Sequence, residues 1–475
     1  MARAFGPDVS RRDLLRLGGL GLAGLALAGV GTGLAGCAPT TPGSGGSGST
    51  TGTLNMLYFG DQKAATTLQN SLQPQVKKID KDLSIKVTAI NGTDWNDFLA
   101  KVLTLIAAGQ APDLVSVATE GLQLMASKKL ITPLDSYVTK DMSTLKSTYF
   151  NDIHPALVEA MMFEGHLYNM PDSFNAGSMF FNTGVLQKAG ATTPSPTWTM
   201  DDFHTTAQQI KSAGGQILPF DWVVRLWGSW TSFLYANDGN LLQEGKYPGG
   251  DWLWSKAYDA GDPSIAGRKG GWKWGTPTAN SDASVEALQY VIDMQKAGLS
   301  PSPDVGGGGT LQGLFSSGRI GMSIGGGFWA GGLHNAGMAP GTFNVQFFPR
   351  WKSNKSLFGT GGYSIFESSQ KKDAAWEVIK MMIQPESFDI MFPGNVTTPG
   401  RKSLMTAQRY APTGPENWKV FYDQLDGSVP ISAPPYYNAL ATSLNQRTTQ
   451  AVSAGRAKPS LDAMQADLEK ISKGS

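Results

Sequence analysis

The chain is poor in the residues that bind metals or form covalent cross-links. It has one cysteine, Cys37, in 475 residues, and its four histidines stand at positions 154, 166, 204 and 334. A single cysteine excludes a disulfide within the chain. No two histidines have the His-x-x-x-His spacing of a zinc site. We therefore expect no metal and no other cofactor.

Positive charge forms no cluster along the chain. The sequence has 39 basic and 38 acidic residues, and residues 1–36 hold four of the arginines and two of the aspartates. The remainder therefore carries 35 basic and 36 acidic residues, without a basic run. This balance argues against a nucleic-acid partner and against steering of a strongly charged ligand.

A serine nucleophile is also excluded. Residues 321–325 match Gly-x-Ser-x-Gly around Ser323. The hydrolase turn with this motif needs an acidic residue and then a histidine downstream. His334 is the only later histidine, and no Asp or Glu stands between it and Ser323. A glycosidase with two carboxylates stays open, because sequence spacing cannot reveal such a pair.

The amino-terminal region reads as an export signal. Residues 17–37 carry no charge and are long enough to cross a bilayer. They contain eight glycines, which make a poor helix core. A basic start, an apolar middle and small residues at the end are typical of a signal peptide. An uncleaved anchor helix is the alternative interpretation.

Two short motifs make this signal specific. Arg11 and Arg12, within Ser-Arg-Arg-Asp-Leu-Leu, resemble a twin-arginine export signal. Leu-Ala-Gly-Cys at 34–37 resembles a bacterial lipobox, which implies that residues 1–36 are removed and Cys37 is lipidated. Residues 37–53 then form a Gly, Ser, Thr and Pro linker. We expect a protein tethered to the outer face of the bacterial cytoplasmic membrane, at the cell surface or in the periplasm.

The body of the chain begins with alternating strands and helices. Residues 54–59, 83–89 and 113–117 are short apolar runs typical of buried strands. Between them, residues 64–79 predict a helix interrupted at Pro74, and residues 95–108 predict a second helix. This order predicts an α/β fold with a parallel sheet covered by helices.

The strand ends predict where a ligand binds. Ligands of open parallel sheets lie beyond the carboxyl ends of the strands. Asp61 and Lys63 follow the first predicted strand, and Glu120 follows the third. We therefore expect these three side chains at one edge of a binding site.

Five further segments carry a family resemblance. In order along the chain they are AAGQAPDL at 107–114, LYNMPDSF at 167–174, LFSSGRIGM at 314–322, GGYSI at 361–365 and NVTTPGRK at 395–402. Together they resemble the motifs of extracellular solute-binding proteins of ABC importers, the family that includes maltose-binding protein. The resemblance spans about 400 residues.

The resemblance implies a two-lobed periplasmic-binding-protein fold with the ligand cleft between hinge-linked lobes. Mapped here, lobe 1 comprises residues 54–171 and 360–384, and lobe 2 comprises residues 172–359 and 385–475. Such proteins close around their ligand by hinge bending. By the resemblance, the protein is a monomer that performs no chemistry and delivers its ligand to the permease subunits of an ABC transporter.

Aromatic residues favour a sugar as the ligand. Seven of the 13 tryptophans lie within residues 222–274. We interpret five of them as core packing: Trp222, Trp252, Trp254, Trp272 and Trp274. Trp227 and Trp230 precede a segment at 236–239 that resembles one near the site of maltose-binding proteins. A sugar has C–H faces and a hydroxyl rim, which suit aromatic platforms flanked by carboxylates and amides.

The candidate ligand-binding residues fall into four groups. They are the platforms Trp227, Trp230, Trp329, Tyr436 and Tyr437, the rim groups Asp61, Lys63 and Glu120, the cleft-floor residues Asp172, Asn175 and Tyr363, and Arg401 as a guanidinium near the cleft. Three alternatives remain open: a non-sugar cargo such as a peptide, polyamine or metal ion, a secreted glycosidase, and a sensing or adhesion protein. The stretch 247–275 matches no family motif.

Overall fold

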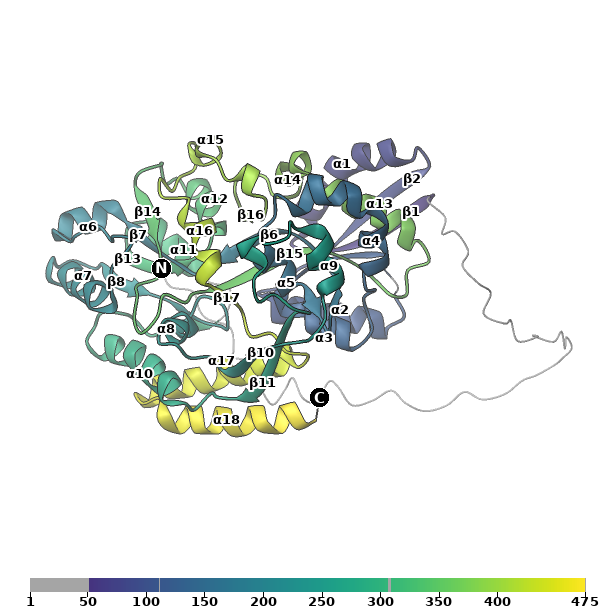
Figure 1. The fold of residues 1–475 in the computed structure, drawn as a ribbon. Coiled ribbons are helices and arrows are strands. Elements are labelled where there is room, and N and C mark those ends of the chain that lie inside the picture. The colour runs from purple at the N-terminus through teal and green to yellow at the C-terminus, as the bar shows by residue number, and fades with distance from the viewer. Residues whose placement is uncertain (1–50, 111, 306–308, 475) are drawn as a thin grey trace, which may run out of the picture. The chain divides into compact units, whose positions relative to one another are not determined.

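The structure is a computed structural model that describes residues 51–110, 112–305 and 309–474. Cys37, Arg11 and Arg12 lie outside these residues, so lipidation and the export signal stay predictions. The described residues all belong to one compact unit. Within its described part, strands gather into two main sheets with helices around them (Figure 1).

The larger sheet has seven strands among the described residues, in the order β16-β6-β15-β3-β1-β2, with β17 paired to β15. Their bounds are β1 Gly52–Phe59, β2 Leu83–Ile90, β3 Leu114–Ala118, β6 Met170–Ala176, β15 Leu357–Ile365, β16 Thr398–Pro399 and β17 Val429–Pro430. β1 pairs in parallel with β2 and β3, and β15 runs antiparallel to β3 and β6. The parallel sheet predicted from the first three strands is confirmed.

The first helices match their predicted positions, with one correction. α1 (Gln62–Ile79) contains Pro74 without a break, so the predicted interruption is wrong. Pro74 removes one backbone hydrogen bond, at a cost of about 3 kcal/mol. A buried stripe of Ala65, Leu68, Leu72 and Val76 holds the helix together by packing it on the sheet. α2 (Trp95–Ala107) follows β2 as expected.

The smaller sheet has the order β14-β7-β13-β8 within the described residues. Its strands are β7 Ser178–Asn182, β8 Leu218–Asp221, β13 Ile320–Gly325 and β14 Phe343–Gln346. Three strand pairs stand apart from both sheets: β4 (Met162–Phe163) with β5 (His166–Leu167), β9 (Val223–Val224) with β12 (Asp304–Val305), and β10 (Leu242–Lys246) with β11 (Trp272–Pro277).

Two sets of helices cover the two sheets. Those of the larger sheet are α1, α2, α3 Thr119–Ser127, α4 Asp135–Leu145, the π-helix η1 Lys146–Phe150, α5 Pro155–Ala160, α13 Lys372–Met382 and α14 Pro385–Met391. Those of the smaller sheet are α6 Thr183–Ala189, α7 Met200–Ser212, α8 Trp230–Ala236, α10 Asp282–Lys296, α11 Gly309–Ser316 and α12 Phe328–Asn335.

The remaining helices belong to an excursion after α8 and to the carboxyl-terminal part. The excursion holds α9 Asp251–Ala257 and η2 Pro263–Ile265. The carboxyl-terminal part holds η3 Lys402–Leu404, α15 Ala407–Tyr410, α16 Val420–Asp423, η4 Gln424–Gly427, α17 Tyr437–Ala454 and α18 Lys458–Lys473. No helix in the described ranges is long and apolar enough to span a membrane.

The chain passes from the larger to the smaller sheet at one residue. β6 ends at Ala176 in the larger sheet, and β7 begins at Ser178 in the smaller one, with Gly177 between them. β15 returns the chain to the larger sheet beside β6. The predicted lobe boundaries at residues 171 and 360 fall inside β6 and β15, and the boundaries themselves stay a prediction.

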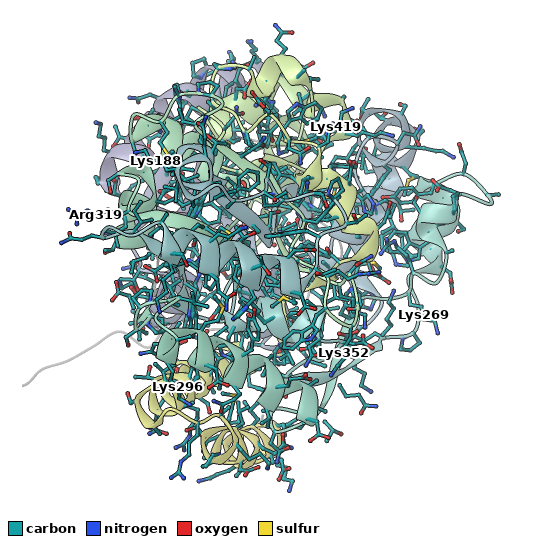
Figure 2. The ribbon with its side chains drawn as sticks, turned by 90° about the vertical axis from the view of Figure 1, so that its left-hand side faces the viewer. Lys188, Lys269, Lys296, Arg319, Lys352 and Lys419 are labelled. Carbon is teal, nitrogen blue, oxygen red and sulfur yellow. The ribbon has the colours of Figure 1, made fainter. Side chains whose placement is uncertain are left out.

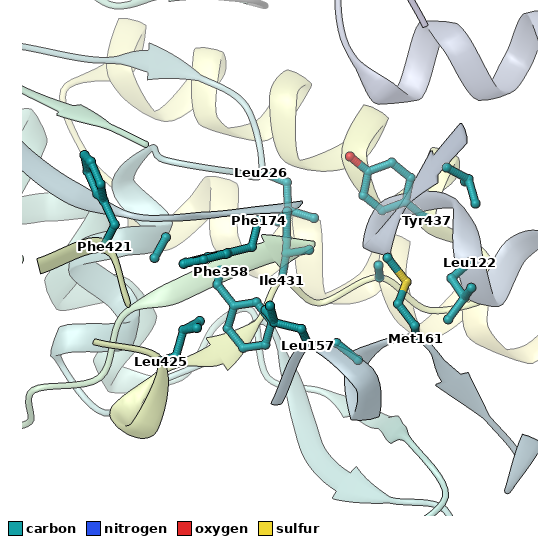
Figure 3. Packing of buried hydrophobic residues seen from close by; sticks show 14 of the residues in the cluster. Leu122, Leu157, Met161, Phe174, Leu226, Phe358, Phe421, Leu425, Ile431 and Tyr437 are labelled. Carbon is teal, nitrogen blue, oxygen red and sulfur yellow. The ribbon is translucent and has the colours of Figure 1, made fainter. Parts of the chain in front are cut away.

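Buried apolar side chains link these elements. Phe174 of β6 and Phe358 of β15 pack with Leu157 of α5 and Leu122 of α3 in one cluster (Figure 3). The basic residues labelled in Figure 2 are exposed, and they run from Arg319 at one edge of the view to Lys269 at the other. Those labelled residues form no single basic patch, in keeping with the sequence.

Candidate functional site

A cavity of about 410 Å³ is lined by strands of the larger sheet and by helices and loops beside both sheets. Its walls come from α2, α3, β6 and β15 on one side and from the segment before α8, the start of α12 and α17 on the other. Small-molecule sites are typically clefts of about 300–1,000 Å³. We call this cavity the central pocket.

Aromatic rings form much of the central pocket. The aromatic lining residues are Phe59, Trp95, Phe174, Trp227, Phe328, Phe392 and Tyr437. Trp227 and Phe328 lie against each other with ring centroids 5.5 Å apart. On the opposite wall, Phe59 and Trp95 meet edge to face at 4.8 Å. These rings offer apolar faces to a ligand.

Three buried side-chain oxygens in the pocket lining have no hydrogen-bond partner among the described residues. They are Oε2 of Glu120, Oδ1 of Asn96 and Oδ1 of Asn445. Buried polar atoms are normally hydrogen-bonded, and an unpaired one costs about 1–3 kcal/mol. Each of these oxygens can accept a hydrogen bond, so a complementary ligand brings hydrogen-bond donors to this wall.

Three charged residues stand together in the pocket lining. Burial raises the pKa of Glu120 to about 7, and nearby Asp94 acts in the same direction while Arg225 opposes it. Burial also lowers the pKa of Arg225 to about 10, and Asp94 and Glu120 counter that shift. Arg225 donates from Nε to the carbonyl of Trp227 at 2.7 Å, and its guanidinium lies 5.4 Å from the Trp227 ring. Arg225 therefore fixes the position of the Trp227 ring.

Asn175 of β6 ties the two sides of the pocket together. Its Oδ1 accepts a hydrogen bond from the backbone N–H of Phe328 at 3.1 Å. Its Nδ2 donates to Oγ1 of Thr397 at 3.1 Å. The amide thus positions the first turn of α12, which carries the Phe328 ring.

One face of α17 supplies a stripe of pocket residues. Tyr437, Ala441 and Asn445 all line the pocket, and they are spaced four residues apart. Residues at this spacing lie above one another on a helix. α17 packs against α2 and α3, so this stripe faces Glu120 and the α2 residues across the pocket.

Four of the predicted ligand-binding residues line the central pocket: Glu120, Asn175, Trp227 and Tyr437. They come from α3, β6, the segment before α8 and α17, which are far apart in the sequence. The fold brings them together, and their contact with a ligand stays a prediction.

Asp61 and Lys63 do not line the pocket. Both side chains are exposed at the start of α1, at the carboxyl end of β1. Asp61 is the N-cap residue of α1 and accepts a hydrogen bond from the N–H of Ala64 at 2.7 Å. The structure therefore gives Asp61 a capping role.

Three predicted aromatic platforms also lie outside the pocket lining. Trp230 is fully buried and donates from Nε1 to Thr448 at 2.9 Å. Trp329 is buried against Phe180 and Phe315. Tyr436 precedes α17 and is half-buried. In this structure neither tryptophan presents a ring face to a ligand.

The remaining three predicted residues form a buried network behind the pocket. Tyr363 of β15 donates its hydroxyl proton to Asp172 of β6. Arg401 is buried, donates to the carbonyls of Tyr149 and Thr148, and lies 4.8 Å from the Tyr149 ring. Asp172, Tyr363 and Arg401 are absent from the pocket lining, so their observed role is to join the hinge strands to η1.

The network also perturbs a carboxyl group. Burial raises the pKa of Asp172 to about 7, while the hydrogen bonds from Tyr363 and Ser173 and the charge of Arg401 oppose the shift. Oδ1 of Asp172 has no hydrogen-bond partner among the described residues. Burial thus favours the protonated form of the Asp172 carboxyl.

Several pocket residues were missed by the sequence reasoning. Asp94, Trp95 and Asn96 follow β2, so the rule on strand ends that selected Glu120 would have found them too. Asn445 could have been found from its four-residue spacing to Tyr437. Arg225 gave no signal, because a lone arginine in a loop has no pattern.

The packing interpretation of the other tryptophans agrees with their positions. Trp222 and Trp254 are buried. Trp252 is half-buried, and Trp272 and Trp274 stack on each other at 5.7 Å on β11. Within the described ranges no group of three or more His, Cys, Asp or Glu residues could hold a metal ion.

Comparison with known proteins identifies the family of this chain. A family model for bacterial extracellular solute-binding proteins matches residues 62–387. A binding protein of Brucella abortus (strain 2308) is 23% identical over 296 residues, which cover 62% of this chain and 63% of that protein. The chain thus spans about 63% of the length of the first curated relatives it matches.

Solved structures share the fold. The ABC substrate-binding protein of Listeria monocytogenes in complex with cycloalternan superposes with a TM-score of 0.70 at 21% identity, over 88% of this chain and 98% of that one. The maltose-bound MalE3 protein of T. maritima gives 0.68 at 16% identity, over 88% and 99%. The expected architecture, with hinge-linked lobes and the cleft between them, is confirmed. The match of the family model over residues 62–387 shows that the chain belongs to the bacterial extracellular solute-binding protein family.

Proposed function

We propose that this protein is an extracytoplasmic receptor that binds a neutral carbohydrate in the central pocket and delivers it to an ABC importer. The pairing of aromatic faces with unpartnered oxygen acceptors carries this proposal. Glu120, Asn96 and Asn445 each present one such oxygen. Hinge opening exposes these atoms, and closure around a sugar gives each of them a hydroxyl donor.

The aromatic walls suit the C–H faces of a sugar ring. Trp227 is held by Arg225 and by Phe328, so its ring is positioned before a ligand arrives. A preorganised platform lowers the entropy cost of binding. We therefore assign Trp227 as the main stacking residue and Phe328 as its support.

The charges in the pocket favour a neutral ligand. Asp94 and Glu120 face one cation, Arg225, whose Nε is already bonded to a carbonyl. An anionic sugar would meet two carboxyl groups, and a polyamine would meet the guanidinium. A neutral sugar or polyol avoids both penalties.

The proposal includes location and partners. The signal peptide at 1–36 directs export through the twin-arginine route, and Cys37 carries the lipid that holds the protein on the outer face of the membrane. A monomer docks on the permease subunits after closing around its ligand. The protein itself catalyses no reaction.

Thermal unfolding against a ligand panel tests the proposal. The purified chain is heated with mono- and oligosaccharides, and with amino acids, peptides and polyamines as controls. A ligand at about 1,000 times its Kd adds roughly 4 kcal/mol of stability and raises the Tm by several degrees. We expect a shift with one class of sugar and recovery of that sugar intact.

Two outcomes would redirect the proposal. A shift with a control compound alone would favour a solute-binding protein for another cargo. A sugar recovered cleaved would favour the glycosidase, for which Asp94 and Glu120 are the two carboxyl groups in the pocket lining.

A further inference from the structure

A long segment after α8 extends from the helices of the smaller sheet to those of the larger sheet. We call residues 242–277 the arm; it comprises β10, α9, η2 and β11. Its base is held by α18, where Gln465 bonds the N–H of Ala279 and the carbonyl of Pro277, both at 2.9 Å. The preceding helix α8 packs on the smaller sheet through Phe233 and Phe220. The arm therefore belongs, at its base, with the smaller sheet.

The arm docks on α5, through a buried carboxylate of that helix, and on the turn between β4 and β5. Glu159 of α5 has no solvent exposure. Its Oε1 and Oε2 lie within 3.0 Å of Lys246, Oε2 accepts from Arg268 at 2.9 Å, and Oε1 accepts from the N–H of Lys269 at 2.8 Å. All three donors belong to the arm. A buried carboxylate is tolerated only with such partners, so α5 and the arm are complementary surfaces.

Backbone contacts make the docking close and specific. The N–H of Gly165, between β4 and β5, donates to the carbonyl of Gly270 at 2.9 Å, and Trp252 donates to the carbonyl of Gly165 at 3.0 Å. A Cβ on Gly270 would lie 2.6 Å from Cα of Gly165 and 2.3 Å from the carbonyl oxygen of Pro248 within the arm. A Cβ on Gly271 would lie 2.2 Å from the carbonyl oxygen of Met162. Only glycine allows this approach of the two backbones.

A third contact reaches the π-helix. Lys146 pairs with Asp259 at 2.8 Å, and Phe150 meets Tyr258 with ring centroids 5.9 Å apart. The hydroxyl of Tyr149, in the same π-helix, donates to the carbonyl of Pro171 in β6 at 2.5 Å. The arm thus touches a segment that is bonded directly to a hinge strand.

The arm is also linked to the central pocket. Gln123 of α3 donates to the carbonyl of Trp272 in β11 at 2.7 Å. Glu120 stands three residues earlier, on the same side of that helix. In addition, Trp272 of the arm and Trp227 of the pocket pack against one cluster of Tyr235, Leu357 and Val429.

From these contacts we infer that the arm is a clasp between the two lobes, which holds the closed state and must release from α5 and Gly165 for the cleft to open. The inference rests on the proposed hinge-closing receptor, because the clasp has a role only if the lobes separate. The base of the arm lies with the smaller sheet, its far part binds the fully buried Glu159 carboxylate through the partly exposed Lys246 and Arg268, and it contacts the helix that carries Glu120. Closure around a ligand and docking of the arm therefore support each other.

The test measures the separation of the lobes without any ligand. Spin labels are placed at Lys78→Cys in α1 and Lys188→Cys in α6, both exposed, in a chain with Cys37→Ser. Gly270→Ala places a methyl group against Gly165 and against Pro248 of the arm, so the arm cannot keep its present seat on Gly165. Gly245→Ala is the control on the same hairpin, because its Cβ meets no atom closer than 3.5 Å. We expect Gly270→Ala to raise the ratio of long to short inter-label distances about 10-fold, within the usual range of coupling between sites.

A second pair of variants addresses the ion pair. Arg268→Met removes one arm donor of Glu159, and Arg447→Met removes a comparable pair with Asp467 that joins α17 to α18. Of these two variants, only Arg268→Met should lengthen the distance between the two spin labels. Should Gly270→Ala fail to fold, Trp252→Phe deletes the hydrogen bond to Gly165 with little change in shape, and a shift of about 3-fold is expected.

Distances in Gly270→Ala and Arg268→Met that match their controls would overturn the clasp. Sugar binding is measured separately by thermal unfolding. If the protein binds a sugar but the inter-label distances of the variants match those of their controls, the clasp is wrong and the carbohydrate proposal stands. If the distances shift but the protein binds no sugar, the carbohydrate proposal is wrong and the clasp stands.

Discussion

Phe328 lines the central pocket, and Trp329, the next residue of α12, is 2% exposed and packs in the core against Phe180 and Phe315. Consecutive residues of a helix point about 100° apart, so only one of the two rings can face a ligand. Phe328 is that residue, and it meets Trp227 at 5.5 Å.

Trp227→Ala should therefore weaken sugar binding by about 1–3 kcal/mol and leave the fold intact, because it removes the stacking platform. Trp329→Ala should lower the free energy of unfolding by about 3–5 kcal/mol, as other buried tryptophans do. Calorimetric titration and urea unfolding of both variants separate the two roles. Unchanged affinity of Trp227→Ala for the sugar would show that Trp227 does not contact the ligand.

Asn445→Ala should weaken sugar binding by about 0.5–1.5 kcal/mol, since one hydroxyl of the ligand loses its acceptor. Gln446→Ala is the matched control, because its amide stands next on α17 and is exposed. Titration of both variants with the sugar found in the unfolding screen is the measurement. Equal affinities would mean that Oδ1 of Asn445 is not a ligand contact.

Asp172→Asn should flatten the dependence of stability on pH. Burial raises the pKa of Asp172 to about 7 against the opposing effects of Tyr363 and Arg401, so the folded state binds its proton more tightly than the unfolded state does. Its stabilising contribution is full below about pH 4 and is lost as the pH rises through about 7. One pKa unit corresponds to about 1.36 kcal/mol, which limits the effect to about 4 kcal/mol.

The free energy of unfolding by urea at pH 5 and pH 8 gives the size of this effect. The wild-type protein should lose more stability between the two values than Asp172→Asn does. Glu120, whose pKa is also raised to about 7, contributes with the same sign in both proteins. An identical loss in the two proteins would show that Asp172 stays ionised across this range.

Cys37→Ala should release the protein from membranes, because the lipid attached at Cys37 is the proposed anchor. Membrane fractionation of the producing cells measures this. Retention of the variant in the membrane would indicate that residues 17–37 stay as an anchor helix.

Replacement of Arg11 and Arg12 by lysine should block export of the folded protein through the twin-arginine route. The amount of mature protein outside the cytoplasm is compared with that of the unaltered chain. Normal export would indicate the general secretory route.

The start of the fold could be predicted from local sequence. The apolar runs at 54–59, 83–89 and 113–117 became β1, β2 and β3 because a buried parallel strand needs little more than a short run of β-branched and aliphatic residues. Pro74 was the exception, since the cost of one proline was outweighed by packing that the local sequence does not show.

The candidate site was predictable only in part. Glu120 follows a predictable strand, and its position at the sheet edge follows from topology. Asp61 follows another strand in the same way, yet it caps α1 instead, because its side chain finds the free N–H of Ala64. Strand ends identify a region, and local hydrogen bonding decides which side chains remain available.

By itself the sequence determined the class of fold and the family, because these depend on periodicity and on motifs along the chain. Only the tertiary structure decided that Phe328 and not Trp329 faces the pocket, that Asp172, Tyr363 and Arg401 form a buried hinge network, and that the arm docks on Glu159. These outcomes depend on contacts between segments far apart in the sequence. Packing decides which face of a helix meets its neighbours, and it also decides which groups pair with a buried charge. No local sequence pattern contains this information.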